Sequence, residues 1–217
     1  MNNFKKYYQK KTDVYGMSGK REEKIIGLLG KNIKGLQILE IGCSDGYFGE
    51  KLIKLGGVVT GTDISQKLIV KAKKVLNQAK IVDPSEGKLP FKTATFDVVI
   101  ASELIEHLFQ PQVFLKEINR VTKKKGKLVL TTPNLLYWGN RLKFMKGEFV
   151  YQNTGVFDEG HIHFYTHQTL KDDLVNSGFK ITQENHVFAG NRSLNLIKSK
   201  LPGVFAYQFV VVAEKSN

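Results

Sequence analysis

Two short runs of sequence constrain the possible folds of this chain most. The first run is apolar and ends in a glycine turn, and the second follows about twenty residues later and ends in a carboxylate. The first run is residues 37–41 and leads into Gly42, and the second is residues 58–63 and ends at Asp63. Glycine lets the backbone turn sharply and approach a ligand closely because it has no Cβ. A carboxylate at the end of the second strand can accept hydrogen bonds from two ribose hydroxyls. The pattern predicts a βαβ unit that binds the ribose of a nucleotide-like ligand.

Composition narrows the class of protein further. The only cysteine, Cys43, excludes an intramolecular disulfide, and no Cys/His cluster has structural-zinc spacing. The formal charge of +13 would attract acidic partners, but the lysines are spread in short groups, so charge alone does not indicate a nucleic-acid partner. No apolar run is long enough to span a bilayer, and residues 1–8 lack a signal-peptide core. We expect a cytoplasmic chain without stable membrane insertion, and its oligomeric state stays open.

Alternating helical and extended patterns predict an α/β fold. Helices are expected over residues 21–29, 46–55, 65–76, 111–121 and 167–177. Strands are expected over residues 37–41, 58–63, 80–82, 96–101, 127–132, 179–187 and 206–214. Right-handed crossovers then give a Rossmann-like, doubly wound, mostly parallel seven-stranded sheet with an antiparallel C-terminal strand. We expect one domain over residues 1–217, with an N-terminal helical arm over about 1–34 and a cap insertion after the fifth strand over about 134–164.

The glycine turn over residues 42–49 has three interpretations. A dinucleotide-binding turn has the pattern G-x-G-x-x-G, but Ser44 stands at its middle position, where a pyrophosphate would meet a side chain. The same turn matches the G-x-S-x-G elbow of α/β-hydrolases. That elbow normally follows several strands, whereas this turn follows the first predicted strand. The third interpretation depends on three blocks of sequence taken together.

These blocks are residues 40–48 (EIGCSDGYF), 62–65 (TDIS) and 89–103 (LPFKTATFDVVIASE). In this order and spacing they resemble the first motif, the ribose-binding strand end and the fourth-strand motif of class I S-adenosylmethionine-dependent methyltransferases. The likeness extends over about residues 35–180. Ser44 departs from the commonest pattern, which has glycine there, and the family tolerates it because no diphosphate docks at this position. The resemblance implies S-adenosyl-L-methionine as the cofactor and methyl transfer as the reaction.

The resemblance also implies which residues hold the methionine part of the cofactor. The main chain at Gly42, Cys43 and Ser44 would cradle it. Glu40 would lie near its amino group, either directly or through a water molecule. The ordinary alternative for Glu40 is that its carboxylate caps a turn.

The nucleoside part has its own candidates. By the same resemblance, Asp63 would bind the ribose hydroxyls and Ile64 would lie against the adenine. Asp83 would accept a hydrogen bond from the adenine amino group, and Ser102 would border the sulfonium. The alternative for Asp83 is an ordinary turn residue before Pro84.

Candidate groups for the methyl acceptor follow the fourth strand and lie in the cap. Glu103, Glu106 and His107 can face one point if they begin a helical turn. His161 and His163 lie in the cap, close to Asp158 in the sequence. The candidate catalytic residues are therefore His107, His161 and His163, any of which could remove a proton from the acceptor.

A narrower resemblance concerns a metal. The spacing of Glu103, Glu106, His107 and His161 is similar to that in metal-dependent members of the family, which include small-RNA 3′-terminal 2′-O-methyltransferases and ubiquinone-pathway O-methyltransferases. By that resemblance these four residues would hold a divalent ion such as magnesium, which would grip two substrate oxygens and lower the pKa of the acceptor hydroxyl. The alternative is a metal-free site, in which His107 packs against the protein and hydrogen-bonds a backbone carbonyl.

The cap itself allows two uses. Its aromatic side chains could stack on a planar acceptor, although packing between cap and sheet is the more general role. Residues 134–146 combine apolar and cationic side chains, so this segment is a substrate lid by our preferred interpretation and an anionic-membrane surface by the second.

The sequence thus predicts a methyltransferase that acts on an oxygen or nitrogen of a small metabolite or glycan precursor. A metal-assisted RNA 2′-O- or catechol O-methyltransferase is the second enzyme class. A non-catalytic S-adenosylmethionine-binding regulatory protein is the third possibility.

Overall fold

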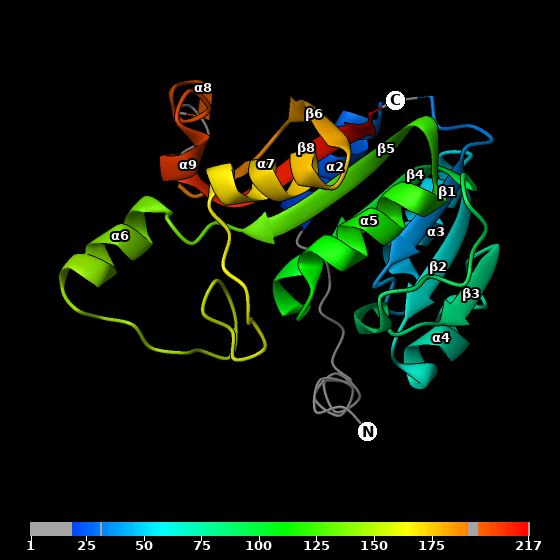
Figure 1. Cartoon of the computed structure of the whole chain (residues 1–217), viewed down its shortest axis with the longest axis horizontal. Helices are drawn as coiled ribbons and strands as arrows, with labels where there is room; N and C mark the ends of the chain where they lie inside the picture. The colour runs from blue at the N-terminus through cyan, green and yellow to red at the C-terminus, as the bar shows by residue number, and fades with distance from the viewer. Residues whose placement is uncertain (1–18, 31, 191–194, 217) are drawn as a thin grey trace.

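The computed structural model describes residues 19–30, 32–190 and 195–216 (Figure 1). The helices are α2 (Gly19–Leu29), α3 (Tyr47–Lys54), α4 (Gln66–Ala72), α5 (Pro111–Val121), α6 (Trp138–Met145), α7 (His167–Asn176), α8 (Asn195–Lys198) and α9 (Pro202–Phe205), with 3₁₀ turns η1 (Pro84–Glu86) and η2 (Ile105–His107). The strands are β1 (Gln37–Ile41), β2 (Val58–Asp63), β3 (Gln78–Ile81), β4 (Phe96–Ser102), β5 (Thr122–Pro133), β6 (Phe179–Glu184), β7 (Val187–Phe188) and β8 (Ala206–Lys215). Residues 1–18 of the expected N-terminal arm lie outside the described residues, and the division into arm, domain and cap stays a prediction.

One sheet runs through the molecule in the order β3-β2-β1-β4-β5-β8-β6, and β7 also pairs with β8. Strands β1 to β5 pair in parallel, whereas β8 is antiparallel to β5, β6 and β7. The predicted α/β fold with an antiparallel C-terminal strand is therefore confirmed. The last strand in the chain does not form an edge, because it lies between β5 and β6.

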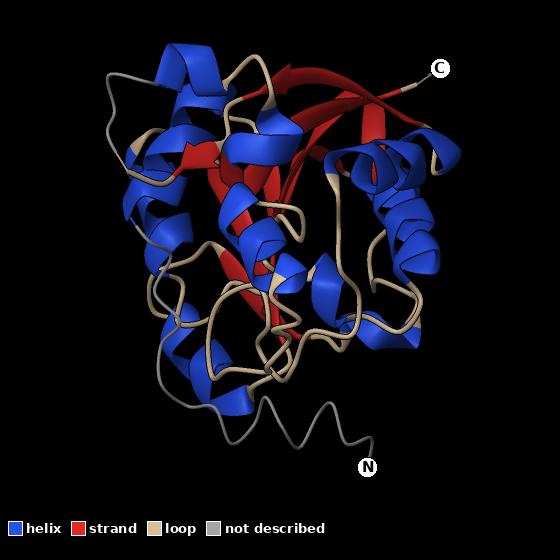
Figure 2. Cartoon of the chain, turned by 90° about the vertical axis from the view of Figure 1, so that its left-hand side faces the viewer, coloured by secondary structure: helices blue, strands red, loops and turns tan. Residues whose placement is uncertain are grey.

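Helices cover both faces of this sheet (Figure 2). Alternate side chains of β1 enter different cores: Leu39 packs with residues of α5 and α7, whereas Ile38 packs with residues of α2, α3 and α4. Alternation along a strand places Glu40 on the same face as Ile38. A carboxylate therefore enters an otherwise apolar layer directly before the glycine turn. Among the described residues, no helix has both the length and the apolar character that crossing a bilayer requires.

The predicted strand over residues 179–187 is divided in two. Between β6 and β7, the Asn185 amide donates to the Val210 carbonyl at 3.0 Å, and the Val210 amide donates to Nδ1 of His186 at 3.2 Å. Because Nδ1 accepts this bond, Nε2 of neutral His186 carries the proton and donates to Glu184 at 3.0 Å. The hydrogen bonds from His167 and then His186 lower the pKa of Glu184 to about 2. A side-chain acceptor, His186, therefore replaces a main-chain acceptor between β6 and β8, and Glu184 and His167 hold its imidazole in place.

Two predicted boundaries were wrong for a local reason. The helix expected to reach residue 76 ends at Ala72, and β3 begins at Gln78 instead of residue 80. Asn77 accepts the Val59 amide of β2 at 2.8 Å through its side chain. This bond ties the end of the helical segment to the sheet and starts β3 early. The cap also contains a helix, α6, that the aromatic-rich sequence did not reveal.

The packing of β2 against the glycine turn gives a stability prediction. A Cβ on Gly61 would lie 2.5 Å from Leu76 Cδ1 and 2.6 Å from Cys43 Sγ. We expect Gly61→Ala to lower the free energy of unfolding by about 1–3 kcal/mol, the usual range for overpacking. The matched control is Gly27→Ala in α2, where no atom lies within 4 Å of the added Cβ; this variant should gain up to about 1 kcal/mol. Urea denaturation measures both, and equal stability of the two variants would contradict the packing.

Candidate active site

The functional side chains gather where strands β1, β2, β4 and β5 end. The carboxyl ends of parallel strands meet at one edge of a sheet, and ligands of open α/β folds bind there. This edge carries the glycine turn after β1, Asp63 at the end of β2 and Ser102 at the end of β4. The sheet order places β1 between β2 and β4. Residues far apart in the chain therefore surround a common region.

Hydrogen bonds from its main-chain amides hold the glycine turn in place. Gly42 and Cys43 donate to the Thr62 carbonyl at 2.7 and 2.9 Å, and Ser44 donates to Oδ2 of Asp63 at 2.9 Å. The Gly46 amide donates to the Cys43 carbonyl at 2.9 Å. A phosphate bound to such a turn requires these amides as donors. Because they are engaged within the protein, the turn is unsuited to a diphosphate and offers a ligand mainly carbonyl oxygen and open space.

Glu40 is the first of two carboxylates beside this turn. It is 4% exposed, and its Oε2 has no hydrogen-bond partner. Burial raises the pKa of Glu40 to about 8, and the charge of Asp63 adds to this shift. A buried carboxyl oxygen without a partner favours a ligand that brings a cationic donor. The amino group of S-adenosyl-L-methionine is such a donor, so Glu40 fits the role that the sequence predicted.

Asp63 is the second carboxylate. Its Oδ2 accepts the Ser44 amide, and its Oδ1 accepts the Ser65 amide at 2.8 Å. Burial raises the pKa of Asp63, while the bonds from the Ser65 and Ser44 amides oppose the rise. Each carboxylate oxygen can accept more than one hydrogen bond. Asp63 is thus fixed in orientation and can still receive ribose hydroxyls. Ile64 follows it and is buried.

Two other predicted cofactor residues are engaged in local bonds. Oδ1 of Asp83 accepts the amide and hydroxyl of Ser85 at 2.9 and 2.5 Å, which caps η1. Its Oδ2 makes neither of these bonds. The Ser102 hydroxyl lies 2.8 Å from the Thr131 hydroxyl of β5. The adenine role of Asp83 and the sulfonium role of Ser102 stay predictions.

Glu103 lies directly after β4 in an unusual conformation. Its φ is +52°, which is uncommon for a residue with a side chain. Its Oε1 accepts the Thr131 hydroxyl at 2.9 Å, and its Oε2 lies 3.6 Å from Nη1 of Arg21 in α2. The structure therefore holds Glu103 between α2 and β5. No sequence pattern indicates Arg21 at this site, because the residue lies far from Glu103 in the chain.

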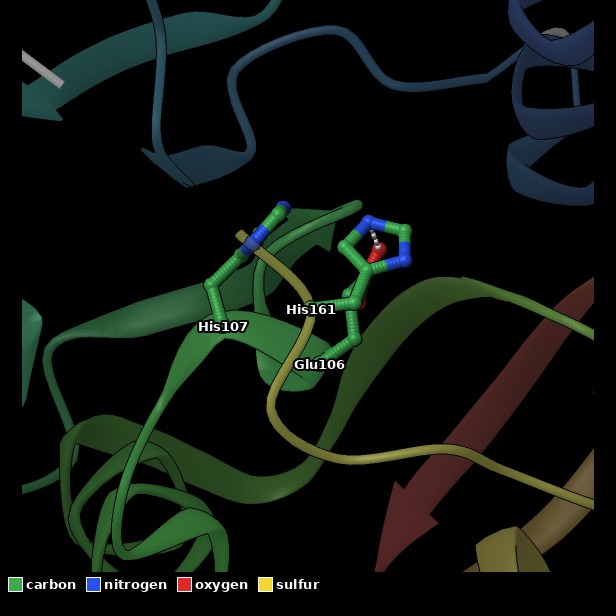
Figure 3. Close-up of side chains that lie close together, drawn as sticks. All are labelled: Glu106, His107 and His161. Atoms are coloured by element: carbon green, nitrogen blue, oxygen red, sulfur yellow. Dashed lines mark ion pairs between the residues drawn. The ribbon is translucent and has the colours of Figure 1, made fainter. Parts of the chain in front are cut away.

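Glu106, His107 and His161 form a cluster of side chains (Figure 3). One ligand atom from each lies within 4.8 Å of the others, and all three side chains are buried. Nδ1 of His107 lies 2.9 Å from the Gly160 carbonyl, and Nδ1 of His161 lies 2.9 Å from the Val156 carbonyl. A carbonyl only accepts, so each Nδ1 carries a proton and each Nε2 is the basic nitrogen when the ring is neutral. His161 Nε2 lies 4.0 Å from Glu106 Oε1.

Glu106 is 1% exposed and has one satisfied oxygen. Oε2 accepts the Thr132 hydroxyl at 3.1 Å, whereas Oε1 has no hydrogen-bond partner. Burial, followed by the charge of Glu103, raises the pKa of Glu106 well above its usual value. Two imidazoles secured at Nδ1 beside an unpartnered carboxyl oxygen resemble the outer-shell arrangement of metal-binding histidines. The three residues could hold a divalent ion, but the structure does not bring Glu103 into their group.

The cap reaches this cluster through its main chain. The Ile162 and His163 amides both donate to the Glu106 carbonyl at 3.0 Å. Asp158 Oδ1 accepts the Gly160 amide at 2.8 Å, which shapes the turn before His161. These bonds explain why His161, 54 positions after His107 in the printed sequence, lies next to it. The side chain of His163 is not part of the cluster.

Comparisons with known proteins identify the family of the chain. Residues 15–184 match a family model described as a methyltransferase domain. A ubiquinone biosynthesis O-methyltransferase of Coxiella burnetii (strain RSA 493 / Nine Mile phase I) is 32% identical over 123 residues, which are 55% of this chain and 53% of the relative. The protein of that name from Bartonella bacilliformis is 28% identical over 156 residues, 69% of this chain and 62% of the relative. The chain thus spans between about half and two thirds of these relatives.

Solved structures share the fold. An S-adenosylmethionine-dependent methyltransferase from Mesorhizobium loti has a TM-score of 0.68 at 18% identity and covers 91% of this chain and 99% of its own. Magnesium protoporphyrin IX methyltransferase from Synechocystis PCC 6803, solved with S-adenosylhomocysteine, has a TM-score of 0.64 at 19% identity and covers 91% of this chain and 83% of its own. The family model covers most of the chain, and the sheet has the antiparallel C-terminal strand that was expected from the sequence. The chain therefore belongs to the methyltransferase-domain family, among the class I S-adenosylmethionine-dependent methyltransferases.

Proposed function

We propose that this chain transfers the methyl group of S-adenosyl-L-methionine to an oxygen of a small metabolite. The observation that carries the proposal is the buried cluster of Glu106, His107 and His161 at the sheet edge that also carries the glycine turn. An acceptor hydroxyl must lose its proton during methyl transfer, and this cluster offers basic groups for it. The relatives named O-methyltransferase favour oxygen over nitrogen and make a ubiquinone-pathway hydroxyl compound the first acceptor to test.

The cofactor would supply a methyl carbon that its positive sulfur has already activated. Glu40 would bind the amino group and Asp63 the ribose hydroxyls, with Ile64 and Asp83 at the adenine. These contacts orient the donor and exclude water, which is most of what a methyl transfer requires of a protein. The amides of the glycine turn support this choice of ligand because they are engaged within the protein.

His161 is our first candidate for the base. Its Nδ1 proton is fixed on the Val156 carbonyl, so its Nε2 can accept the acceptor proton. The resulting imidazolium would lie beside the Glu106 carboxyl, 4.0 Å from Nε2. His107 has the same Nδ1 arrangement and is the second candidate, and His163 is the third.

A divalent ion is the alternative means of activating the acceptor hydroxyl. The observation that favours it is that three possible ligand atoms lie within 4.8 Å of one another. Glu106, His107 and His161 would be the ligands, and Glu103 would join only after releasing Thr131 and Arg21. Such an ion lowers the pKa of a bound hydroxyl. Two imidazoles favour manganese or zinc over magnesium. Calorimetric titration of Mn²⁺ into the protein and into Glu106→Gln distinguishes the two cases, because no binding at millimolar concentration excludes the ion.

The pKa of Glu40 predicts how cofactor affinity depends on pH. In the free protein this pKa is about 8, so the carboxyl is mostly protonated at neutral pH. Pairing with an ammonium group favours the ionised form, so binding releases a proton. Affinity for S-adenosylhomocysteine should therefore rise by up to about tenfold per pH unit towards pH 8 and level off above it. Calorimetry at several pH values measures this. Glu40→Gln should bind more weakly with a flat profile, and a flat profile in the unmodified protein would contradict the role.

The activity is tested by the release of S-adenosylhomocysteine across a panel of acceptors. The panel should hold catechol-type ring compounds, amines, sugar nucleotides and a short RNA. We expect turnover with a hydroxyl-bearing small molecule. Cofactor binding without turnover on any acceptor would favour a regulatory protein, and turnover on RNA alone would favour the nucleic-acid class. A cytoplasmic location stays a prediction for cell fractionation.

A further inference from the structure

Helix α6 exposes an apolar stripe that no described part of the protein covers. Trp138, Leu142 and Met145 are 46%, 44% and 76% exposed. With about 100° of rotation per residue, these three side chains fall within about 60° of the helix circumference. Asn140 points to the opposite side, is buried, and donates to the Asn134 and Leu135 carbonyls. Asn140 therefore fixes α6 so that the stripe faces outward.

Cations lie on both sides of this stripe. At about 100° of rotation per residue, Arg141 lies on one flank of the stripe and Lys146 on the other. Lys143 is exposed next to them. Within the described residues, none of the three forms an ion pair with a carboxylate. The loop after α6 adds the exposed side chains of Phe149, Val150 and Tyr151, and Phe149 packs on Phe144 of the helix with ring centroids 6.2 Å apart. The exposed apolar surface thus extends beyond the helix.

The position of α6 makes this surface accessible. Figure 1 shows α6 at the left of the molecule, beyond the end of β5 and away from the sheet. The ring of Phe144 also lies 5.7 Å from that of Phe157, which follows the Val156 carbonyl that holds His161. Helix α6 is therefore connected, through Phe144 and Phe157, to the segment that carries a candidate catalytic residue.

We propose that α6 and the loop to Tyr151 dock on the surface of an anionic lipid bilayer. An apolar stripe with a tryptophan and flanking cations is the arrangement that binds at the boundary between lipid headgroups and acyl chains. A second copy of the chain fits less well, because a two-fold contact would place Arg141, Lys143 and Lys146 of both copies against each other. The formal charge of +13 also favours an anionic surface.

The test uses Trp138, the only tryptophan of the chain, as an intrinsic probe. The full-length protein is titrated, without cofactor or acceptor, with phosphatidylcholine vesicles and with vesicles that contain one quarter phosphatidylglycerol. We expect a blue shift of the emission and quenching by brominated acyl chains with the anionic vesicles only. The proposal does not depend on methyl transfer, so loss of activity and loss of vesicle binding are separate results.

Variants make the test specific. Leu142→Gln with Met145→Gln, and separately Lys143→Glu with Lys146→Glu, should each weaken vesicle binding at least about tenfold. Lys67→Glu with Lys71→Glu on α4 changes the net charge equally at another exposed helix and should change binding by less than about twofold. No emission shift with anionic vesicles would overturn the proposal. Equal loss in the α4 control, or self-association through α6 without vesicle binding, would also overturn it.

Discussion

Replacing Asp63 by Asn should weaken S-adenosylhomocysteine binding at least about 100-fold, or about 3 kcal/mol, because the two charge-assisted hydrogen bonds that we propose to the ribose would be lost. Asn also accepts only one of the two amide bonds that Asp63 receives from Ser44 and Ser65. We therefore expect an added stability loss of about 1 kcal/mol. Calorimetry measures the affinity, and thermal unfolding shows that the variant is folded at the temperature used.

The control for this variant is Asp83→Asn. Its carboxylate caps a turn, and its proposed adenine contact is a single hydrogen bond, so its affinity should fall by less than about tenfold. An Asp63→Asn protein that is folded and binds as tightly as the unmodified protein would remove Asp63 from the cofactor site.

Replacing Glu106 by Gln should lower turnover at least about 100-fold, since the cluster would lose its carboxylate whether it serves a base or an ion. Affinity for S-adenosylhomocysteine should stay the same because Glu106 does not contact the glycine turn in this account. The variant should also unfold at a higher temperature. Burial of Glu106 costs free energy at neutral pH, because its carboxyl must take up a proton or keep a charge away from water. Gln avoids this cost and can still accept the hydrogen bond from the Thr132 hydroxyl.

Glu117→Gln is the matched control for Glu106→Gln. Glu117 pairs with Arg120 on α5, and the hydrogen bond from Arg120 lowers the pKa of Glu117. Its replacement should lower stability and leave turnover unchanged. Single-turnover kinetics and thermal unfolding of both variants separate the two effects. Full turnover in Glu106→Gln would exclude the cluster from catalysis.

The sequence predicted the sheet well because its strands are short apolar runs between clear turns. In β4, alternate residues of the run 98–101 enter the two cores, so this strand is a continuous apolar run. The break between β6 and β7 was not predictable, since it depends on His186 replacing a main-chain acceptor for Val210. That bond joins residues whose proximity only the folded sheet creates.

The candidate site was predictable only where its residues lie at the ends of neighbouring strands. Glu40, Gly42 and Asp63 lie at strand ends, so their spacing alone places them together. The pairing of Glu103 with Arg21 joins α2 to the end of β4 and has no local signal. The proximity of His161 to His107 depends on main-chain bonds between the cap and Glu106. Motif spacing reveals residues on neighbouring strand ends, whereas contacts between distant segments require the structure.

Calorimetric titration of the same preparation with S-adenosylhomocysteine and with NAD measures which cofactor the glycine turn accepts. We expect saturable binding of S-adenosylhomocysteine with one site per chain, and no heat from NAD. The amides of Gly42, Cys43, Ser44 and Gly46 are engaged within the protein and disfavour a diphosphate, while Glu40 and Asp63 favour an amino group and a ribose. Tight NAD binding together with no response to S-adenosylhomocysteine would show that the site binds a dinucleotide and not the methyl donor.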